Sequence, residues 1–220
     1  MIAVESASYE VVEYLYNTFK STIDLSKKGL FDSTLFSIAT YNPNVEVLEY
    51  LTTILINKSV IKPQINEIND VFILAARNKN VKVIQYLYNK FKAKINANAR
   101  DMCGYTAFMI ALRENNIEVL RYLCNTFEDQ IDINIQNEYG YTAFMFAALN
   151  SSLEVIQYLH NIFKDQIDIN TQSKNGITAF MLAASNTNVE VIQYLYNTYK
   201  DQIDINTQSK NGNTAFMLAA

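Results

Sequence analysis

The sequence predicts an all-α fold, a solenoid in which helix–loop–helix units of 36 residues stack one on the next. The string Thr-Ala-Phe-Met recurs at a step of 36 residues, beginning at Thr106, Thr142, Thr178 and Thr214. A second block, Val-Ile-Gln-Tyr-Leu or a close variant, recurs at the same step, beginning at Val11, Val47, Val83, Val119, Val155 and Val191. No insertion or deletion interrupts these periods. Self-similarity at a fixed step of this length is typical of stacked structural repeats.

The first helix of each repeat is expected to begin at a residue whose side-chain oxygen can accept a first-turn N–H. These positions are Thr34, Asp70, Thr106, Thr142, Thr178 and Thr214. An apolar, Ala-rich stretch follows, and small Ala side chains let neighbouring helices approach closely. The chain starts and stops within such a stretch, so both terminal repeats are expected to be incomplete.

The second helix is expected ten residues later, after strong N-cap residues. These residues are Ser8, Asn44, Asn80, Asn116, Ser152 and Asn188. In the last complete copy, apolar residues then recur at helical spacing: Val189, Ile192, Leu195, Tyr196 and Tyr199. This spacing gives the second helix one apolar face.

A loop with a hairpin-like turn is predicted after each second helix. The alternating sequence of residues 202–206 indicates a short extended segment. The pairs Asn175-Gly176 and Asn211-Gly212 follow such segments, and an Asn-Gly pair favours a turn with positive φ.

These residues resemble the ankyrin repeat over essentially the whole chain. Residues 176–181, Gly-Ile-Thr-Ala-Phe-Met, are similar to the segment around the family's Thr-Pro-Leu-His, and residues 189–192 to its second helix. Asp204-Ile205-Asn206 is similar to the family's Asp-Val-Asn. The hairpin Asp of the family has its counterparts at Asp101, Asn137, Ser173 and Ser209. The resemblance implies an ankyrin-type solenoid, with residues 1–220 as a single array of about six repeats.

The sequence departs from the family pattern in three respects. The period is 36 rather than 33 residues, so the second helix is expected to be nearly one turn longer. Asp32 and Ile68 replace the hairpin Gly in two copies. Met replaces the family's His, which predicts a buried apolar layer of Met109, Met145 and Met181. Side chains of the Thr caps and of Asn134, Asn170 and Asn206 are then expected to hold the loops.

Composition excludes several classes of function. The net charge of −4 argues against sequence-independent binding of nucleic acid. No apolar run reaches the 18 residues that a membrane span needs, and the N-terminal residues show no secretory signal, so membrane insertion is not expected and a cytoplasmic location is. The cysteines, Cys103 and Cys124, lack metal-site spacing.

No catalytic constellation is visible, so the chain is not expected to be an enzyme or to hold a cofactor. His160 is the only histidine, and tyrosine, threonine or cysteine takes its place in the other repeats. Asp168 and Asp204 belong to repeated loop segments and are interpreted as loop hydrogen-bond acceptors. Single glycines spaced 36 residues apart form no phosphate-binding loop.

The resemblance to ankyrin repeats implies instead a concave binding surface made of hairpin tips and the exposed side of the first helices. In two central repeats this surface corresponds to Met102, Cys103, Tyr105, Arg113, Glu138, Tyr139, Tyr141 and Leu149. Tyr and Arg are enriched in the residues that dominate binding energy at protein interfaces. The alternative is that these aromatic side chains only pack one hairpin against the next.

The function expected from the resemblance is a protein-binding module or scaffold. The alternative is a substrate-recruiting arm of a larger enzyme or signalling protein whose catalytic domain lies outside this chain. Neither end has a polar capping face, so the chain is expected to be a fragment of a longer array. Exposed apolar residues there, including Ile2, Val4 and Leu218, also predict self-association.

Overall fold

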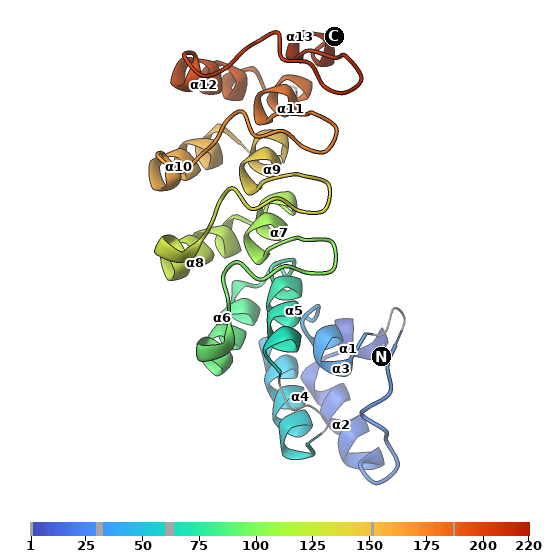
Figure 1. Cartoon of the computed structure of the whole chain (residues 1–220). Helices are drawn as coiled ribbons and strands as arrows, with labels where there is room; N and C mark the ends of the chain where they lie inside the picture. The colour runs from blue at the N-terminus through green and yellow to red at the C-terminus, as the bar shows by residue number, and fades with distance from the viewer. Residues whose placement is uncertain (1, 30–32, 60–63, 151, 187) are drawn as a thin grey trace. The chain divides into compact units, whose positions relative to one another are not determined.

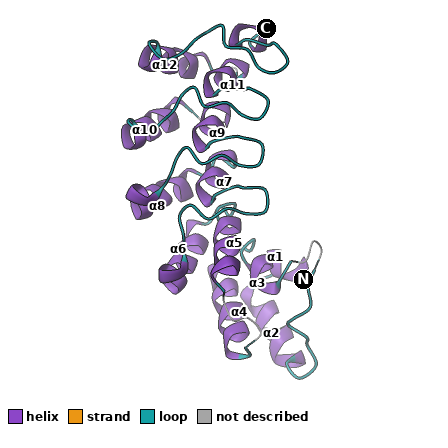
Figure 2. Ribbon diagram, in the orientation of Figure 1, coloured by secondary structure: helices purple, strands orange, loops and turns teal. Residues whose placement is uncertain are grey.

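The computed structural model describes residues 2–29, 33–59, 64–150, 152–186 and 188–220 (Figure 1). All regular secondary structure in these ranges is helical (Figure 2). The chain divides into two compact units, residues 1–99 and residues 100–220, each of which is described by itself. A single array over residues 1–220 therefore stays a prediction.

The first unit contains three first helices and three second helices in its described residues. The first helices are α1 (Ile2–Ser6), α3 (Leu35–Ala39) and α5 (Ile65–Ala75). The second helices are α2 (Tyr9–Phe19), α4 (Val45–Asn57) and α6 (Val81–Phe91). Asparagine amides join successive repeats: Asn42 donates to the carbonyls of Val4 and Ala7, at 2.6 and 3.0 Å. Asn78 occupies the equivalent position one repeat later and donates to the carbonyl of Thr40 at 2.7 Å.

The expected start of a first helix at Asp70 is wrong. Helix α5 begins at Ile65, after Gln64, and Asp70 lies inside it with an exposed side chain. The reason is Ile68, which replaces the hairpin glycine: its side chain is buried on the same helical face as Val71 and Phe72. The residues that form a hairpin in other repeats therefore extend the helix here. In the preceding repeat the residue that replaces the hairpin glycine, Asp32, lies outside the described residues.

The second unit repeats one arrangement along residues 100–220. Its first helices are α7 (Ala107–Arg113), α9 (Ala143–Asn150), α11 (Ala179–Ser185) and α13 (Ala215–Leu218). Its second helices are α8 (Ile117–Phe127), α10 (Leu153–Phe163) and α12 (Val189–Tyr199). Figure 1 shows the first helices stacked in one row, with the second helices on one side and the hairpin loops on the other.

Threonine caps begin the first helices of this unit as expected. Thr106 Oγ1 accepts the N–H of Met109 at 3.2 Å, and Thr178 Oγ1 accepts that of Met181 at 3.2 Å. Outside this unit, Thr34 Oγ1 accepts the N–H of Ser37 at 3.1 Å. The second helices likewise begin directly after the six expected residues, from Ser8 to Asn188.

The three additional residues of the 36-residue period follow the second helix. In two repeats they form 3₁₀ turns, η2 (Lys92–Lys94) and η3 (Glu128–Gln130). Residues 164–166 and 200–202 form hydrogen-bonded turns at the same place. These residues lie at the end of the second helix, as expected, but they form a 3₁₀ helix or a turn and do not lengthen the α-helix itself.

The segment expected to be extended is a turn. Residues 205 and 206 lie in a turn, and Asp204 Oδ1 accepts the N–H of Asn206 at 2.9 Å. Asp168 accepts the N–H of Asn170 in the same way at 3.0 Å, so the interpretation of both carboxylates as loop acceptors is confirmed. In the preceding repeat both isoleucines, Ile167 and Ile169, are buried, so the alternation there does not mark one face of a strand, whereas Ile205 is 53% exposed.

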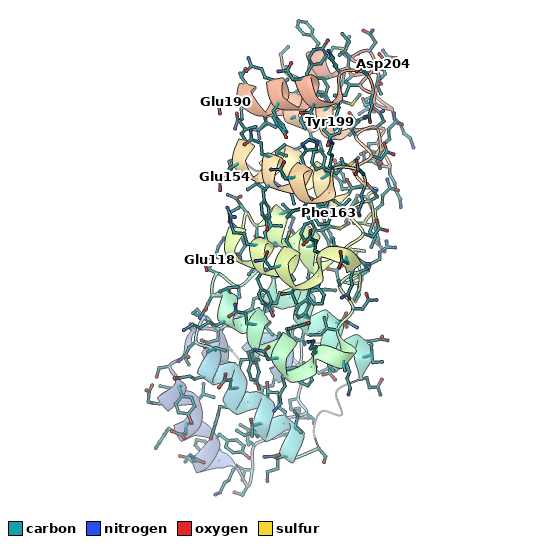
Figure 3. All side chains as sticks on the ribbon, turned by 90° about the vertical axis from the view of Figure 1, so that its left-hand side faces the viewer. Glu118, Glu154, Phe163, Glu190, Tyr199 and Asp204 are labelled. Carbon is teal, nitrogen blue, oxygen red and sulfur yellow. The ribbon has the colours of Figure 1, made fainter. Side chains whose placement is uncertain are left out.

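In the repeats of α6, α8, α10 and α12, the core includes the aromatic side chain that ends the second helix. Phe163 is 1% exposed, and its ring lies 5.7 Å from that of Phe108 in an edge-to-face arrangement. Tyr199 makes the equivalent contact with Phe144 at 6.4 Å. Figure 3 labels Phe163 and Tyr199 at successive levels of the stack. Edge-to-face pairs of this kind stabilise a core beyond the area that they bury.

Replacing Tyr199 by Phe is expected to raise the free energy of unfolding by about 1 kcal/mol. The Tyr199 hydroxyl is buried without a hydrogen-bond partner, and burial raises the pKa of the phenol to about 12. The equivalent residues of earlier repeats are Phe91, Phe127 and Phe163. Urea unfolding measures the change, and Tyr196→Phe, on the same helix but 46% exposed, is the matched control. A loss of stability in Tyr199→Phe would show that the hydroxyl has a partner.

Candidate protein-interaction surface

The hairpin loops of the second unit are held by their own side chains. Asp101 Oδ1 accepts the N–H groups of Cys103 and Tyr105, at 2.9 and 2.8 Å. Asn137 Oδ1 accepts those of Tyr139 and Tyr141, each at 2.9 Å. Ser173 and Ser209 make the corresponding bonds with their hydroxyl groups. Each loop therefore presents its tip in a defined conformation.

Backbone hydrogen bonds also join each hairpin to the next. Glu138 N–H donates to the Cys103 carbonyl at 3.0 Å, Lys174 N–H to that of Tyr139 at 2.9 Å, and Lys210 N–H to that of Asn175 at 2.9 Å. Three glycines with φ between 74° and 79° make this approach possible, because a Cβ atom would lie about 3 Å or less from the backbone of the next hairpin: Gly104, Gly140 and Gly176. The Asn-Gly pairs predict the positive φ of Gly176 and Gly212. The hairpins thus form a continuous edge rather than separate loops.

The expected apolar layer under the hairpins is confirmed. Met109, Met145 and Met181 are each 1% exposed. Asn134 and Asn170 link the loops of successive repeats, since Asn170 Nδ2 donates to the Gln202 carbonyl at 2.9 Å and Asn134 makes the equivalent bond to Gln166. For Asn206 the structure shows only the bond from its own N–H to Asp204.

Two of the expected contact tyrosines pack on a shared phenylalanine. The Phe146 ring, on α9, lies 5.7 Å from the rings of both Tyr105 and Tyr141. Arg113 stacks on Tyr105, with its guanidinium carbon 4.7 Å from the centre of the Tyr105 ring. These side chains are half-buried, so the alternative of hairpin packing accounts for part of the aromatic content here.

Arg113 is further held by Glu114, whose Oε1 accepts its Nη2–H at 3.0 Å. Burial would lower the pKa of Arg113, but its hydrogen bonds to Glu114 and Tyr105 outweigh that effect and raise the pKa. The guanidinium group therefore stays charged on the first-helix side of the surface.

The remaining expected contact residues lie at the hairpin tips and on α9. Met102 is 94% exposed and Tyr139 is 56% exposed. Cys103 and Glu138 are also exposed, and Leu149 is half-buried. Phe146 was not among the expected residues. The equivalent position holds Ile110 and Leu182 in the neighbouring repeats. The aromatic residue at this position is the sequence signal that could have identified Phe146 as part of the surface.

The two cysteines lie apart, one in a hairpin and one in a helix. Cys124 is 1% exposed on α8, and burial raises the pKa of its thiol to about 12, so the thiol is protonated at neutral pH. Cys103 is exposed and, like Cys124, makes no disulfide. In the described part of the chain, no three His, Cys, Asp or Glu side chains gather as a metal site would require.

His160 packs between repeats, as expected of an edge position. Its Nδ1 lies 2.7 Å from the Tyr194 hydroxyl, and its ring lies 5.6 Å from that of Tyr199. Burial, followed by the charge of Lys164, lowers the pKa of His160, while Asp165 opposes the shift. The folded chain therefore takes up a proton here less readily than the unfolded chain.

The free energy of unfolding is expected to fall as the pH drops from 7.5 to 5.5. A histidine whose folded-state pKa is depressed stabilises the fold fully above the unfolded pKa near 6.5, and this stability is lost as the pH falls. Because His160 is the only histidine, His160→Gln should flatten the curve in this window. Urea unfolding at several pH values measures both chains. Identical slopes for them would contradict the assignment.

Comparison with known protein families identifies the fold. A family model described as ankyrin repeats (3 copies) matches residues 72–172 and 159–220. None of the curated proteins matches the chain. The chain belongs to the ankyrin-repeat family, and its fold is the all-α ankyrin solenoid. Ankyrin repeats are generally protein-binding modules. Within the described residues, no helix combines the length and apolar character needed to cross a membrane.

Proposed function

We propose that the second unit binds a protein partner through the hairpin tips and the exposed side of α7 and α9. One observation carries the proposal: two large apolar side chains, Met102 and Tyr139, stand 94% and 56% exposed on adjacent rigid hairpins. Aromatic and Met side chains are enriched in the cores of protein interfaces, and tyrosine in particular dominates their binding energy.

The packing behind these tips supports the proposal. The Tyr139 N–H donates to Asn137 Oδ1, which holds the backbone at this tip, and the ring of Phe146 packs against Tyr105 and Tyr141. A surface that is already ordered loses less conformational entropy when a partner binds. The same side chains in flexible loops would bind more weakly.

The proposal is tested with a photo-crosslinking amino acid placed at position 139 in the chain expressed in cells. A discrete crosslinked protein is expected, and Met102→Ser should reduce its yield by about five-fold or more. The matched control carries the crosslinker at Tyr196, which is 46% exposed on α12, a second helix. Equal capture of the same proteins at both positions, or insensitivity to Met102→Ser, would overturn the proposal.

We also infer self-association of this chain, with Phe216 and Met217 as the contact residues. They are 85% and 58% exposed, whereas Val4 and Leu218 are half-buried and the side chain of Ile2 lies outside the described part. Light scattering should show a mass above 25.2 kDa that rises with concentration. Phe216→Ser should restore the monomer. A chain that stays monomeric at every concentration would rule out this contact.

A further inference from the structure

Two lysines occupy the hairpin tips that follow Tyr139. Lys174 and Lys210 are exposed, and neither has an ion-pair partner among the described residues. Elsewhere in residues 100–220, acidic side chains outnumber basic ones. Figure 3, which faces the second helices, shows Glu118, Glu154 and Glu190 at successive levels of that opposite side. The hairpin edge is therefore where this unit would attract negative charge.

The tips lie in a fixed order along the edge. The hydrogen bonds from Lys174 N–H to the Tyr139 carbonyl and from Lys210 N–H to the Asn175 carbonyl place the three hairpins directly beside one another. One layer of packed helices separates consecutive tips, which corresponds to about 8–10 Å. The edge thus offers an apolar site at Tyr139, then a positive charge one layer on, then a second positive charge another layer on.

We propose that the partner presents an extended acidic segment with one apolar side chain followed, at steps of three residues, by two carboxylates. This inference rests on the proposed function and names the chemistry of the partner at the same surface. A polyproline II segment has three residues per turn and rises about 3.1 Å per residue, so residues three apart share one face at about 9 Å. That spacing matches the distance between consecutive hairpin tips. A β-strand does not fit, because residues three apart point to opposite faces.

Glu138 sets the register of such a segment. Its exposed carboxylate stands next to Tyr139 at the tip where the apolar side chain binds. A segment shifted by one layer would place a carboxylate against Glu138, and like charges in contact oppose binding. The apolar side chain therefore binds at Tyr139 and the carboxylates at Lys174 and Lys210.

The test uses fluorescein-labelled peptides and the whole chain, with fluorescence anisotropy as the measurement. One peptide carries leucine and two glutamates at steps of three, with proline and serine between them, and its reversed sequence is tested as well. A peptide of the same composition with adjacent glutamates is the control. We expect the better of the two spaced peptides to bind about five-fold more tightly than the control peptide. The Glu138→Gln substitution should reduce this difference in affinity between the spaced and control peptides.

The lysines are tested by Lys174→Gln combined with Lys210→Gln. This pair of substitutions should weaken binding of the spaced peptide about four- to twenty-five-fold, given roughly two- to five-fold for each exposed ion pair. The matched control combines Lys164→Gln with Lys200→Gln, two exposed lysines that end α10 and α12 at the same 36-residue step. The control removes the same charge and should leave binding within two-fold, roughly the weaker limit for an exposed pair.

Three outcomes overturn the inference: no binding of either spaced peptide, equal affinity for the spaced and adjacent glutamates, or equal effects of the two lysine pairs. If any of them occurs while position 139 still crosslinks a discrete protein, the surface binds a partner of other chemistry. If crosslinking at position 139 also matches that at position 196, the proposed function fails with it.

Discussion

Gly140→Ala is expected to lower the free energy of unfolding by about 2–5 kcal/mol. Gly140 has φ of +79°, a conformation that costs any other residue. A Cβ atom there would also lie 2.6 Å from the Lys174 nitrogen and 2.9 Å from the Ser173 carbonyl carbon. Both atoms belong to the backbone of the next hairpin, so the clash can be relieved only by separating the hairpins.

Gly212→Ala separates the cost of the positive φ from the cost of the clash with the next hairpin. Gly212 has the same φ of +79°, but a Cβ atom there would meet nothing within 4 Å. This variant should therefore lose only the conformational part, about 1–2 kcal/mol. Urea unfolding of the two variants gives the difference. Equal losses would mean that contact between hairpins adds nothing to the stability of the second unit.

Met145→His should lower the free energy of unfolding by about 1–3 kcal/mol at pH 8. Met145 is 1% exposed, and its slot is the one in which the family pattern has histidine. The loop contacts near it are already made by other groups: Thr142 Oγ1 accepts the Met145 N–H at 3.3 Å, and Asn134 bonds the next loop. The Thr142 N–H, which donates to Met145 Sδ at 3.5 Å, could serve one ring nitrogen of an imidazole, but the other ring nitrogen would be buried without a prepared partner.

Met217→His is the matched control, because Met217 holds the same slot of the motif but is 58% exposed. There the imidazole keeps its water, and the change in the free energy of unfolding should stay within about 0.5 kcal/mol. Thermal or urea unfolding compares the two variants. A gain in stability for Met145→His would show that the hairpin offers an acceptor for histidine, and the hydrophobic account of this layer would be wrong.

The sequence by itself determined the features that depend on local chemistry. The second helices begin directly after the six expected Ser and Asn residues, and in three of them the side chain accepts a first-turn N–H: Asn44, Asn80 and Asn188. Gly176 and Gly212 adopt positive φ, as the Asn-Gly pairs predict. The methionine layer is buried because an apolar side chain at a core position of a regular repeat has nowhere else to go.

The tertiary structure alone decided which of several similar residues are free to bind. The sequence does not distinguish the three tyrosines Tyr105, Tyr139 and Tyr141. In the structure two of them pack on Phe146, and only Tyr139 is left mostly exposed. Tyr105 meets a ring from the next repeat and Tyr141 a ring from the first helix of its own repeat, and no local pattern states which ring each tyrosine meets. Tertiary packing also decides where α5 begins. Asp70 is an adequate cap, yet the burial of Ile68 favours a helix that begins at Ile65, because packing outweighs one capping bond.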